Sequence, residues 1–285
     1  MPFEPITWEL RSRSLTTADH TLIMGILNVT PDSFSDGGRW IDTAAAVNRG
    51  RELAAIGTDI IDVGGESTRP GAAPVDATEE LERVIPVVEA LAADGVVVSI
   101  DTSKPTVAAA AIDAGAEIVN DVTGLSNPEM IETCAGTGVG VVIMHMLGDP
   151  RTMQADPNYE YVVADVAEFL RNRANEAIAA GIDTSRIVVD PGIGFGKTIR
   201  HNLALLDSVG TLGDGWPVMI GASRKSFLGS ILDRAGRPSA PEDRDRATDA
   251  TTAMAIERGA SIMRVHDAAG AIDVGRATDA IVRVR

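Results

Sequence analysis

Apolar residues recur along the chain in eight short, nearly continuous runs, each rich in valine and isoleucine. The runs cover residues 21–28, 59–65, 96–101, 116–121, 139–145, 186–190, 217–223 and 261–267. A run without polar alternation is typical of a strand that is covered on both faces. The pattern therefore predicts eight buried strands of the kind found in parallel sheets.

Segments with Ala, Glu and Leu at helical spacing separate these runs, for example at residues 76–93, 159–180 and 243–258. Alternating strands and helices form βαβ units, and a count of eight favours closure into an α/β (β/α)₈ TIM barrel. An open, Rossmann-like sheet is the alternative, because the sequence does not show closure. With 285 residues, the chain suits a single barrel domain, since such barrels occupy about 250 residues. We predict an N-terminal extension over residues 1–20 and a barrel domain over residues 21–285.

Polar residues gather in or just after the C-terminal halves of the predicted strands. They are Asn28, Asp62, Asp101, Asn120, Asp121, His145, Asp190, Ser223, Arg264 and His266. Buried carboxylates and amides are costly unless they are paired, so a ring of them at this end of a barrel predicts an active site. For Asp62 and Asp121 the alternative is that they cap the following helices. Long loops at residues 30–40, 66–75 and 146–159 follow strands and favour ligand binding at the same face.

Composition excludes several classes of function. The formal net charge of −16 argues against nucleic-acid binding, which needs a basic face. No apolar run approaches the ~18 residues of a membrane span, and the N-terminus lacks a signal-peptide core, so we expect a cytoplasmic enzyme that does not bind membranes. The single cysteine, Cys134, cannot form an internal disulfide and is best interpreted as a small buried hydrophobic residue.

The segment DPGIGFGKT, residues 190–198, nearly matches the P-loop pattern G-x-x-x-x-G-K-[ST]. The first glycine of that pattern falls on Pro191, however, so we reject a nucleotide-binding loop. The glycines more plausibly let the backbone approach a flat ligand closely.

Asp101, Asn120 and Asp190 suit a heterocycle with a guanine-like edge. A carboxylate accepts hydrogen bonds from a ring N–H and an exocyclic amine, and an amide both donates and accepts. Lys225 adds a cation for a ring carbonyl or nitrogen. The alternative is a structural ion pair between Asp190 and Lys225.

Arg264 and His266 alternate along the last predicted strand, so their side chains point in the same direction. Together with Asn28 of the first strand they predict an anion site, and Asn28 could offer an oxygen to the Mg²⁺ that accompanies a diphosphate. Ser226, at the start of the next helix, could hold a carboxylate with the free N–H groups there. The alternative for Ser223 or Ser226 is a helix N-cap.

Four sequence blocks together resemble the dihydropteroate synthase family of pterin-binding enzymes. They are IMGILNVTPDSFSDGG (23–38), DVGGESTRPGA (62–72), DPGIGFGKT (190–198) with GASRKSFLG (221–229), and RVHD (264–267). The resemblance implies a barrel that joins 6-hydroxymethyl-7,8-dihydropterin diphosphate to p-aminobenzoate and releases diphosphate. It also implies that sulfonamides compete with p-aminobenzoate, and that the enzyme is a homodimer.

The resemblance assigns a role to each matching residue. Pterin diphosphate would be bound by Thr68, Asp101, Asn120, Asp190, Lys225, Arg264 and His266. Among these, Lys225, Arg264 and His266 would be catalytic. The p-aminobenzoate would be bound by Arg69, Pro70, Phe195 and Ser226, and Mg²⁺ by Asn28. Two alternatives are a pterin-binding methyltransferase module, which should lack the diphosphate contacts, and a non-catalytic pterin-binding paralogue.

Overall fold

A computed structural model describes residues 5–30, 43–67, 74–148 and 152–284. Within these ranges the main sheet has eight parallel strands in the order β8-β7-β6-β5-β4-β3-β10-β9. The strands are β3 (Leu22–Asn28), β4 (Ile60–Gly64), β5 (Val98–Asp101), β6 (Ile118–Asp121), β7 (Gly140–Met144), β8 (Ile187–Asp190), β9 (Met219–Ile220) and β10 (Ile262–Val265).

The two ends of the sheet meet at β8 and β9. A bridge pairs Val189 with Val218, and the Val189 N–H donates to the carbonyl of Pro217 at 2.9 Å. The sheet therefore closes into the predicted barrel, and the open-sheet alternative is wrong. Each of the eight predicted strand segments contains one observed strand, which is shorter than predicted.

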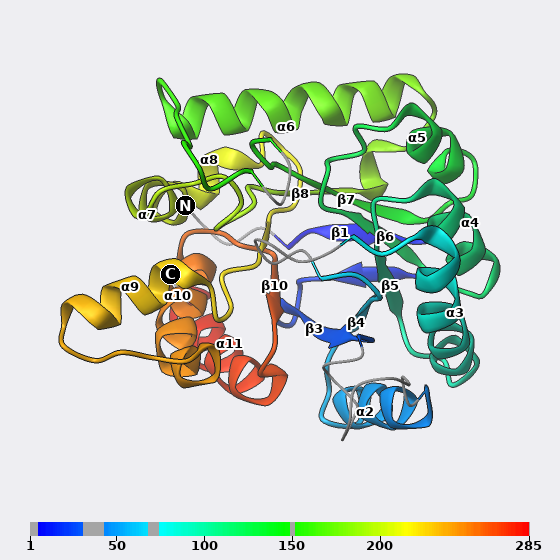
Figure 1. Ribbon diagram of the computed structural model, residues 1–285, viewed down its shortest axis with the longest axis horizontal. Helices are drawn as coiled ribbons and strands as arrows, with labels where there is room; N and C mark the ends of the chain where they lie inside the picture. The colour runs from blue at the N-terminus through cyan, green and yellow to red at the C-terminus, as the bar shows by residue number, and fades with distance from the viewer. Residues whose placement is uncertain (1–4, 31–42, 68–73, 149–151, 285) are drawn as a thin grey trace.

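Helices form a ring outside the barrel (Figure 1). They are α2 (Thr43–Ala55), α3 (Ala77–Ala93), α4 (Pro105–Asp113), α5 (Pro128–Cys134), α6 (Val162–Ala179), α7 (Ile199–Asp207), α8 (Val209–Leu212), α9 (Ser226–Arg234), α10 (Asp245–Glu257) and α11 (Ala268–Val282), with short 3₁₀ turns at Thr184–Arg186 and Pro241–Arg244. None of the helices in the described ranges combines the length and apolarity that crossing a membrane requires.

The two-sided burial of each strand explains its nearly continuous apolar sequence. Along β3, Ile23 and Leu27 belong to the large core cluster that includes the surrounding helices, whereas Leu22 and Met24 pack inside the barrel. Because side chains alternate between the two faces, both sets of positions must be apolar. Polar residues are left for the strand ends, where the site forms.

The N-terminal segment packs into the opposite end of the barrel. It forms a hairpin of β1 (Thr7–Glu9) and β2 (Ser14–Thr16), and the Trp8 ring is fully buried in the interior cluster. The indole N–H of Trp8 donates to the carbonyl of Arg186 at 2.8 Å. A Cβ at Gly140 would come within 2.6 Å of Leu10, so β7 and the hairpin are in close contact. The predicted extension thus covers the barrel end that lies away from the site.

Candidate active site

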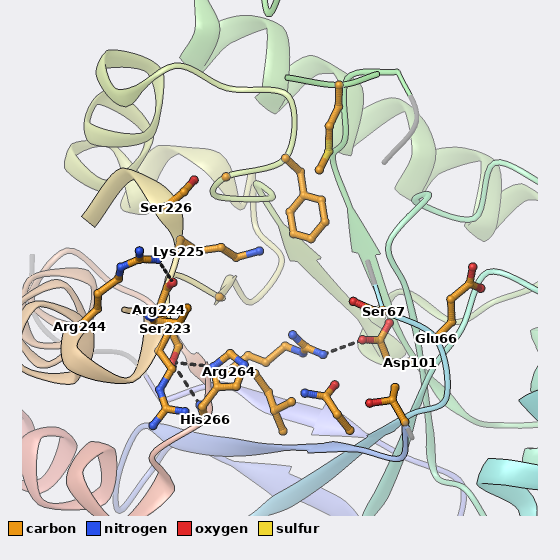
Figure 2. A pocket seen from close by; sticks show the side chains of 18 residues that line it. Glu66, Ser67, Asp101, Ser223, Arg224, Lys225, Ser226, Arg244, Arg264 and His266 are labelled. Carbon is orange, nitrogen blue, oxygen red and sulfur yellow. Dashed lines mark hydrogen bonds and ion pairs between the residues drawn. The ribbon is translucent and has the colours of Figure 1, made fainter. Parts of the chain in front are cut away.

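A cavity of about 450 Å³ opens at the C-terminal ends of the barrel strands (Figure 2). Its lining includes eight of the residues singled out from the sequence: Asn28, Asp101, Phe195, Ser223, Lys225, Ser226, Arg264 and His266. Figure 2 shows Lys225, Ser226 and Arg244 on one side and Asp101 on the other, with Arg264 extending between them. The volume suits a drug-sized or cofactor-sized ligand.

Arg264, at the end of β10, joins two carboxylates from neighbouring parts of the barrel. Its Nε–H donates to Asp62 Oδ2 and an Nη2–H donates to Asp101 Oδ2, both at 2.6 Å. Asp62 Oδ2 also accepts from the Asn120 amide at 3.1 Å. Asp62, fully buried in the middle of β4, therefore connects Arg264 with Asn120.

Burial dominates the electrostatics of this group. Desolvation raises the pKa of Asp101 to about 7, opposed by the charge of Arg264 and assisted by that of Asp62. For Arg264, burial alone would lower the pKa, but Asp62 and Asp101 outweigh it and hold the pKa above its usual range. Asp62 Oδ1 is buried without a hydrogen-bond partner among the described residues. A buried acceptor of this kind is available to a donor on a ligand.

Asp190 ends β8 and lies beneath the cavity lining, 3% exposed. Its Oδ1 accepts the backbone N–H of Gly192 at 2.7 Å. Burial raises the pKa of Asp190 to about 6, and the Gly192 N–H and the charge of Lys225 partly oppose that rise. The carboxylate is therefore mostly ionised at neutral pH.

Lys225 and Phe195 are in contact in the cavity lining. The ammonium Nζ of Lys225 lies 3.8 Å from the centroid of the Phe195 ring, within the range of a cation–π interaction. Lys225 is the residue before α9, and Ser226 begins that helix. The helix N-cap alternative for Ser223 and Ser226 is thus wrong, and Ser226 lines the cavity instead.

His266 is oriented by Ser223. The Ser223 hydroxyl oxygen accepts the backbone N–H of His266 at 3.2 Å and lies 2.9 Å from Nδ1 of the imidazole. The hydroxyl has one proton to donate and two lone pairs, so it can accept the backbone N–H and also donate to Nδ1. In a neutral imidazole, a hydrogen bond donated by Ser223 to Nδ1 would leave the ring proton on Nε2.

Asn28 ends β3, which pairs directly with β10, so the first and last barrel strands bring Asn28, Arg264 and His266 into one cavity as predicted. Asn120 does not reach the lining, since it is buried beneath it against Asp62. Thr68, Arg69 and Pro70 lie outside the described residues.

Two members of the predicted polar ring have other positions. The Asp121 carboxylate accepts backbone N–H groups of Thr123 and Leu125, which holds the turn before α5. The N-caps of α3 and α5 are Asp76 and Asn127, so neither Asp62 nor Asp121 caps the following helix. His145, after β7, is buried beside Lys197.

Two further cations line the cavity without having been predicted. Arg224 has a left-handed backbone, with φ of +59°, and a bidentate ion pair with Asp245 at 2.7 Å. Arg244 donates to the carbonyl of Arg224 at 3.1 Å. With Lys225 and Arg264 they give this wall of an acidic protein a local excess of cations, which suits an anionic ligand. Arg244 lies at the start of the segment predicted as a helix over residues 243–258, and helical spacing alone does not mark it as a cavity residue.

The chain matches a known protein family over most of its length. Residues 24–266 match the family described as pterin binding enzyme. The dihydropteroate synthase of Mycobacterium leprae is 48% identical over 258 residues, covering 88% of this chain and 90% of that protein. The chain belongs to the dihydropteroate synthase family.

Solved structures of the dihydropteroate synthase family share the whole architecture. One from Yersinia pestis, in a sulfonamide drug complex, superposes with a TM-score of 0.90 at 40% identity, covering 97% of this chain and 99% of that chain. One from Burkholderia cenocepacia, complexed with 7,8-dihydropteroate, has a TM-score of 0.88 at 43% identity and covers 99% and 100% of the two chains. The resemblance seen in the sequence blocks is confirmed over nearly the full chain.

Proposed function

We propose that the chain condenses 6-hydroxymethyl-7,8-dihydropterin diphosphate with p-aminobenzoate to give 7,8-dihydropteroate and diphosphate. The observation that carries this proposal is that one cavity is lined by a wall of cations and by Asp101, with the carboxylate of Asp190 and the amide of Asn120 buried directly beneath its lining. Such a site can hold a neutral heterocycle and its anionic leaving group at the same time. The dihydropteroate bound to the Burkholderia relative is the corresponding product.

The pterin would lie over Asp101, Asn120 and Asp190. An ionised Asp190 accepts hydrogen bonds from a ring N–H and the exocyclic amine, and Lys225 supplies a positive charge nearby. The unpartnered Oδ1 of Asp62 supports a further donor from a ligand at this floor. We therefore add Asp62 to the residues predicted to contact the pterin.

Arg264 and His266 would bind the diphosphate. A guanidinium has five N–H groups, and among the described residues Arg264 uses two of them, on Asp62 and Asp101, so it can contact the floor and the leaving group together. The Nε2–H of His266 would be a second donor. We keep Thr68 as a predicted diphosphate ligand from the resemblance alone.

The donor set fits a magnesium ion that is bound largely by substrate. Asn28 offers a neutral amide oxygen in a polar cavity, and no cluster of three or more His, Cys, Asp or Glu residues suited to a metal occurs within the described ranges. Mg²⁺ commonly takes few protein ligands and completes its shell with phosphate oxygens and water. When bound, Mg²⁺ would neutralise negative charge on the departing diphosphate.

The p-aminobenzoate would lie between Phe195 and Ser226. The start of α9 offers free backbone N–H groups, and the hydroxyl of Ser226 adds a donor for the carboxylate. The Phe195 ring gives the arylamine an apolar surface. Arg69 and Pro70 remain predicted contacts, based on the resemblance.

The reaction requires no protein nucleophile. The bond between the pterin methylene carbon and the diphosphate oxygen breaks, and the electron pair leaves with diphosphate while Arg264 and His266 donate to it. The methylene cation is delocalised into the pterin, and the arylamine nitrogen attacks it and then loses a proton. The chain contributes the relative placement of the two substrates and the exclusion of water.

We also propose a cytoplasmic homodimer, as the family resemblance implies. Leu203 of α7 and Met254 of α10 are nearly half exposed, at 46% and 47%. These two helices contact each other and contribute no residue to the cavity lining. An apolar surface there supports subunit contact away from the site.

Diphosphate release tests the proposal. The purified chain is incubated with Mg²⁺ and the pterin diphosphate, with and without p-aminobenzoate, and released diphosphate is measured. Release that requires p-aminobenzoate is expected. No release would favour a methyltransferase module or a non-catalytic paralogue, and release without p-aminobenzoate would indicate hydrolysis instead of condensation.

A further inference from the structure

The loop after β8 is fixed by side chains that hydrogen-bond its backbone carbonyls. Three consecutive carbonyls each accept from a different residue: Gly194 from Gln154 at 2.5 Å, Phe195 from Lys197 at 2.9 Å and Gly196 from Tyr159 at 2.7 Å. Of these donors, Gln154 is exposed and Tyr159 partly buried, whereas Lys197 is 3% exposed. A buried lysine is unusual, and the proposed reaction assigns no role to Lys197.

Lys197 is held in turn by His145. Its Nζ lies 2.9 Å from His145 Nδ1 and 3.4 Å from the His145 carbonyl oxygen. Burial and the charge of Lys197 lower the pKa of His145 to about 3, so the imidazole is neutral and its Nδ1 accepts. The two residues form a buried pair directly under the loop.

The hydrogen bonds that Lys197 makes with His145 and Phe195 do not depend on the charge of the lysine. Burial lowers the pKa of Lys197 to about 7, with the charge of Asp190 opposing that effect and Lys225 adding to it. A neutral amine still has two N–H groups, which suffice for Nδ1 of His145 and the carbonyl of Phe195. The contact therefore persists on both sides of neutral pH.

The loop after β8 is closely packed against its neighbours at two glycines. Gly192 has a φ of +67°, and a Cβ there would lie 1.9 Å from the carbonyl oxygen of His145. A Cβ at Gly194 would lie 3.1 Å from the side chain of Lys225. The loop thus runs in contact with His145 on one side and Lys225 on the other.

Phe195 connects the Lys197–His145 pair to the cavity. Its ring packs with Met144 and Met153 and lies under the ammonium of Lys225 at 3.8 Å. The backbone carbonyl of the same residue accepts the hydrogen bond from Lys197. A shift of that carbonyl would move the ring that faces the arylamine.

We propose that Lys197, held by His145, is a positioning residue that fixes Phe195 for binding of the arylamine substrate. The inference rests on the proposed function, because it assigns p-aminobenzoate to the Phe195 side of the cavity. Neither Lys197 nor His145 lines that cavity, so both would act through Phe195.

Kinetics of four variants test the inference. Lys197→Met removes the donor, and His145→Leu removes its partner. His145→Asn keeps an acceptor, since Asn Oδ1 occupies the place of Nδ1. Arg200→Met removes an exposed cation from the first turn of α7 and is the matched control. For each variant, KM for p-aminobenzoate, kcat, affinity for a pterin and unfolding in urea are measured.

Lys197→Met and His145→Leu should raise KM for p-aminobenzoate about tenfold, the effect of one lost buried hydrogen bond, and change pterin affinity less than about twofold. His145→Asn and Arg200→Met should stay near wild type. If Lys197→Met does not fold, the contrast between His145→Leu and His145→Asn decides.

Three outcomes would overturn the inference when the wild-type enzyme is active. KM for p-aminobenzoate could be unchanged in His145→Leu, or it could rise as much in His145→Asn as in His145→Leu. The variants could also lose affinity for the pterin and for p-aminobenzoate equally. Absence of wild-type turnover would overturn the proposed function itself, and this inference with it.

Discussion

Replacing Asp190 by asparagine should stabilise the fold and weaken pterin binding. The pKa of Asp190 rises from 3.8 to about 6 on burial. At about 1.4 kcal/mol per pKa unit, keeping this carboxylate ionised in the folded protein costs at most about 3 kcal/mol. Asparagine avoids that cost and retains an oxygen for the N–H of Gly192.

The size of the stabilisation depends on pH. Below about pH 3 the carboxyl is protonated in both the folded and the unfolded chain, so Asp190→Asn should have little advantage there. As pH rises from 3.8 towards about 6, the unfolded chain releases the Asp190 proton while the folded chain keeps it, so the wild type loses stability relative to the variant. Above about pH 6 both states are ionised and the difference stays constant. The advantage should be largest, about 1–3 kcal/mol, at pH 8.

Urea unfolding at pH 4.5, 6 and 8 measures this difference. Asp183→Asn is the control with the opposite sign, because hydrogen bonds from Ser185 lower the pKa of Asp183. Binding of a pterin, followed by its fluorescence, should weaken about 10- to 100-fold in Asp190→Asn. A pH-independent stability difference would refute the burial argument, and undiminished pterin affinity would refute the assignment of Asp190.

Three further predictions address other parts of the molecule. Trp8→Ala should cost about 3–5 kcal/mol of unfolding free energy in urea, with kcat of the folded enzyme near wild type; a large fall in kcat would contradict a purely structural role. Ser223→Ala should lower kcat about tenfold without changing pterin affinity, because His266 loses the partner that sets its tautomer; wild-type kcat would contradict this. Chelation should abolish activity and added Mg²⁺ restore it, and Asn28→Ala should raise the Mg²⁺ needed for half-maximal activity about tenfold; activity in chelator would refute a magnesium requirement.

The barrel could be predicted from the sequence because a strand covered on both faces must be apolar at nearly every position. Residues such as Ile23 and Met24 serve different layers but give the same signal. The same argument located the site, since polar residues that cannot be accommodated within such strands are left at their ends. Asn28, Asp101 and Arg264 were therefore found without any knowledge of closure.

Pairings across the barrel could not be predicted in the same way. Arg264 and Asp101 lie far apart in the sequence and in separate strands, and their contact depends on side-chain reach across the closed barrel. The sequence assigned Arg264 to the leaving-group half of the site, whereas the structure also bonds it to two floor carboxylates. The two halves of the site are thus joined by this one guanidinium.

Local detail was also beyond the sequence. Asp62 and Asp121 both lie in predicted strands and both precede a valine, yet the first connects Arg264 with Asn120 and the second holds a turn. The role proposed for Lys197 depends on a buried contact with His145, which precedes it by 52 positions. Only the fold brings such residues together.

The most direct test of the account is the fate of labelled p-aminobenzoate. The wild-type enzyme is given Mg²⁺, the pterin diphosphate and p-aminobenzoate carrying ¹³C in its ring, and the products are identified by mass spectrometry while diphosphate is counted. One labelled dihydropteroate molecule is expected for each diphosphate released. Diphosphate released in excess of labelled product, or a pterin product without the label, would contradict it.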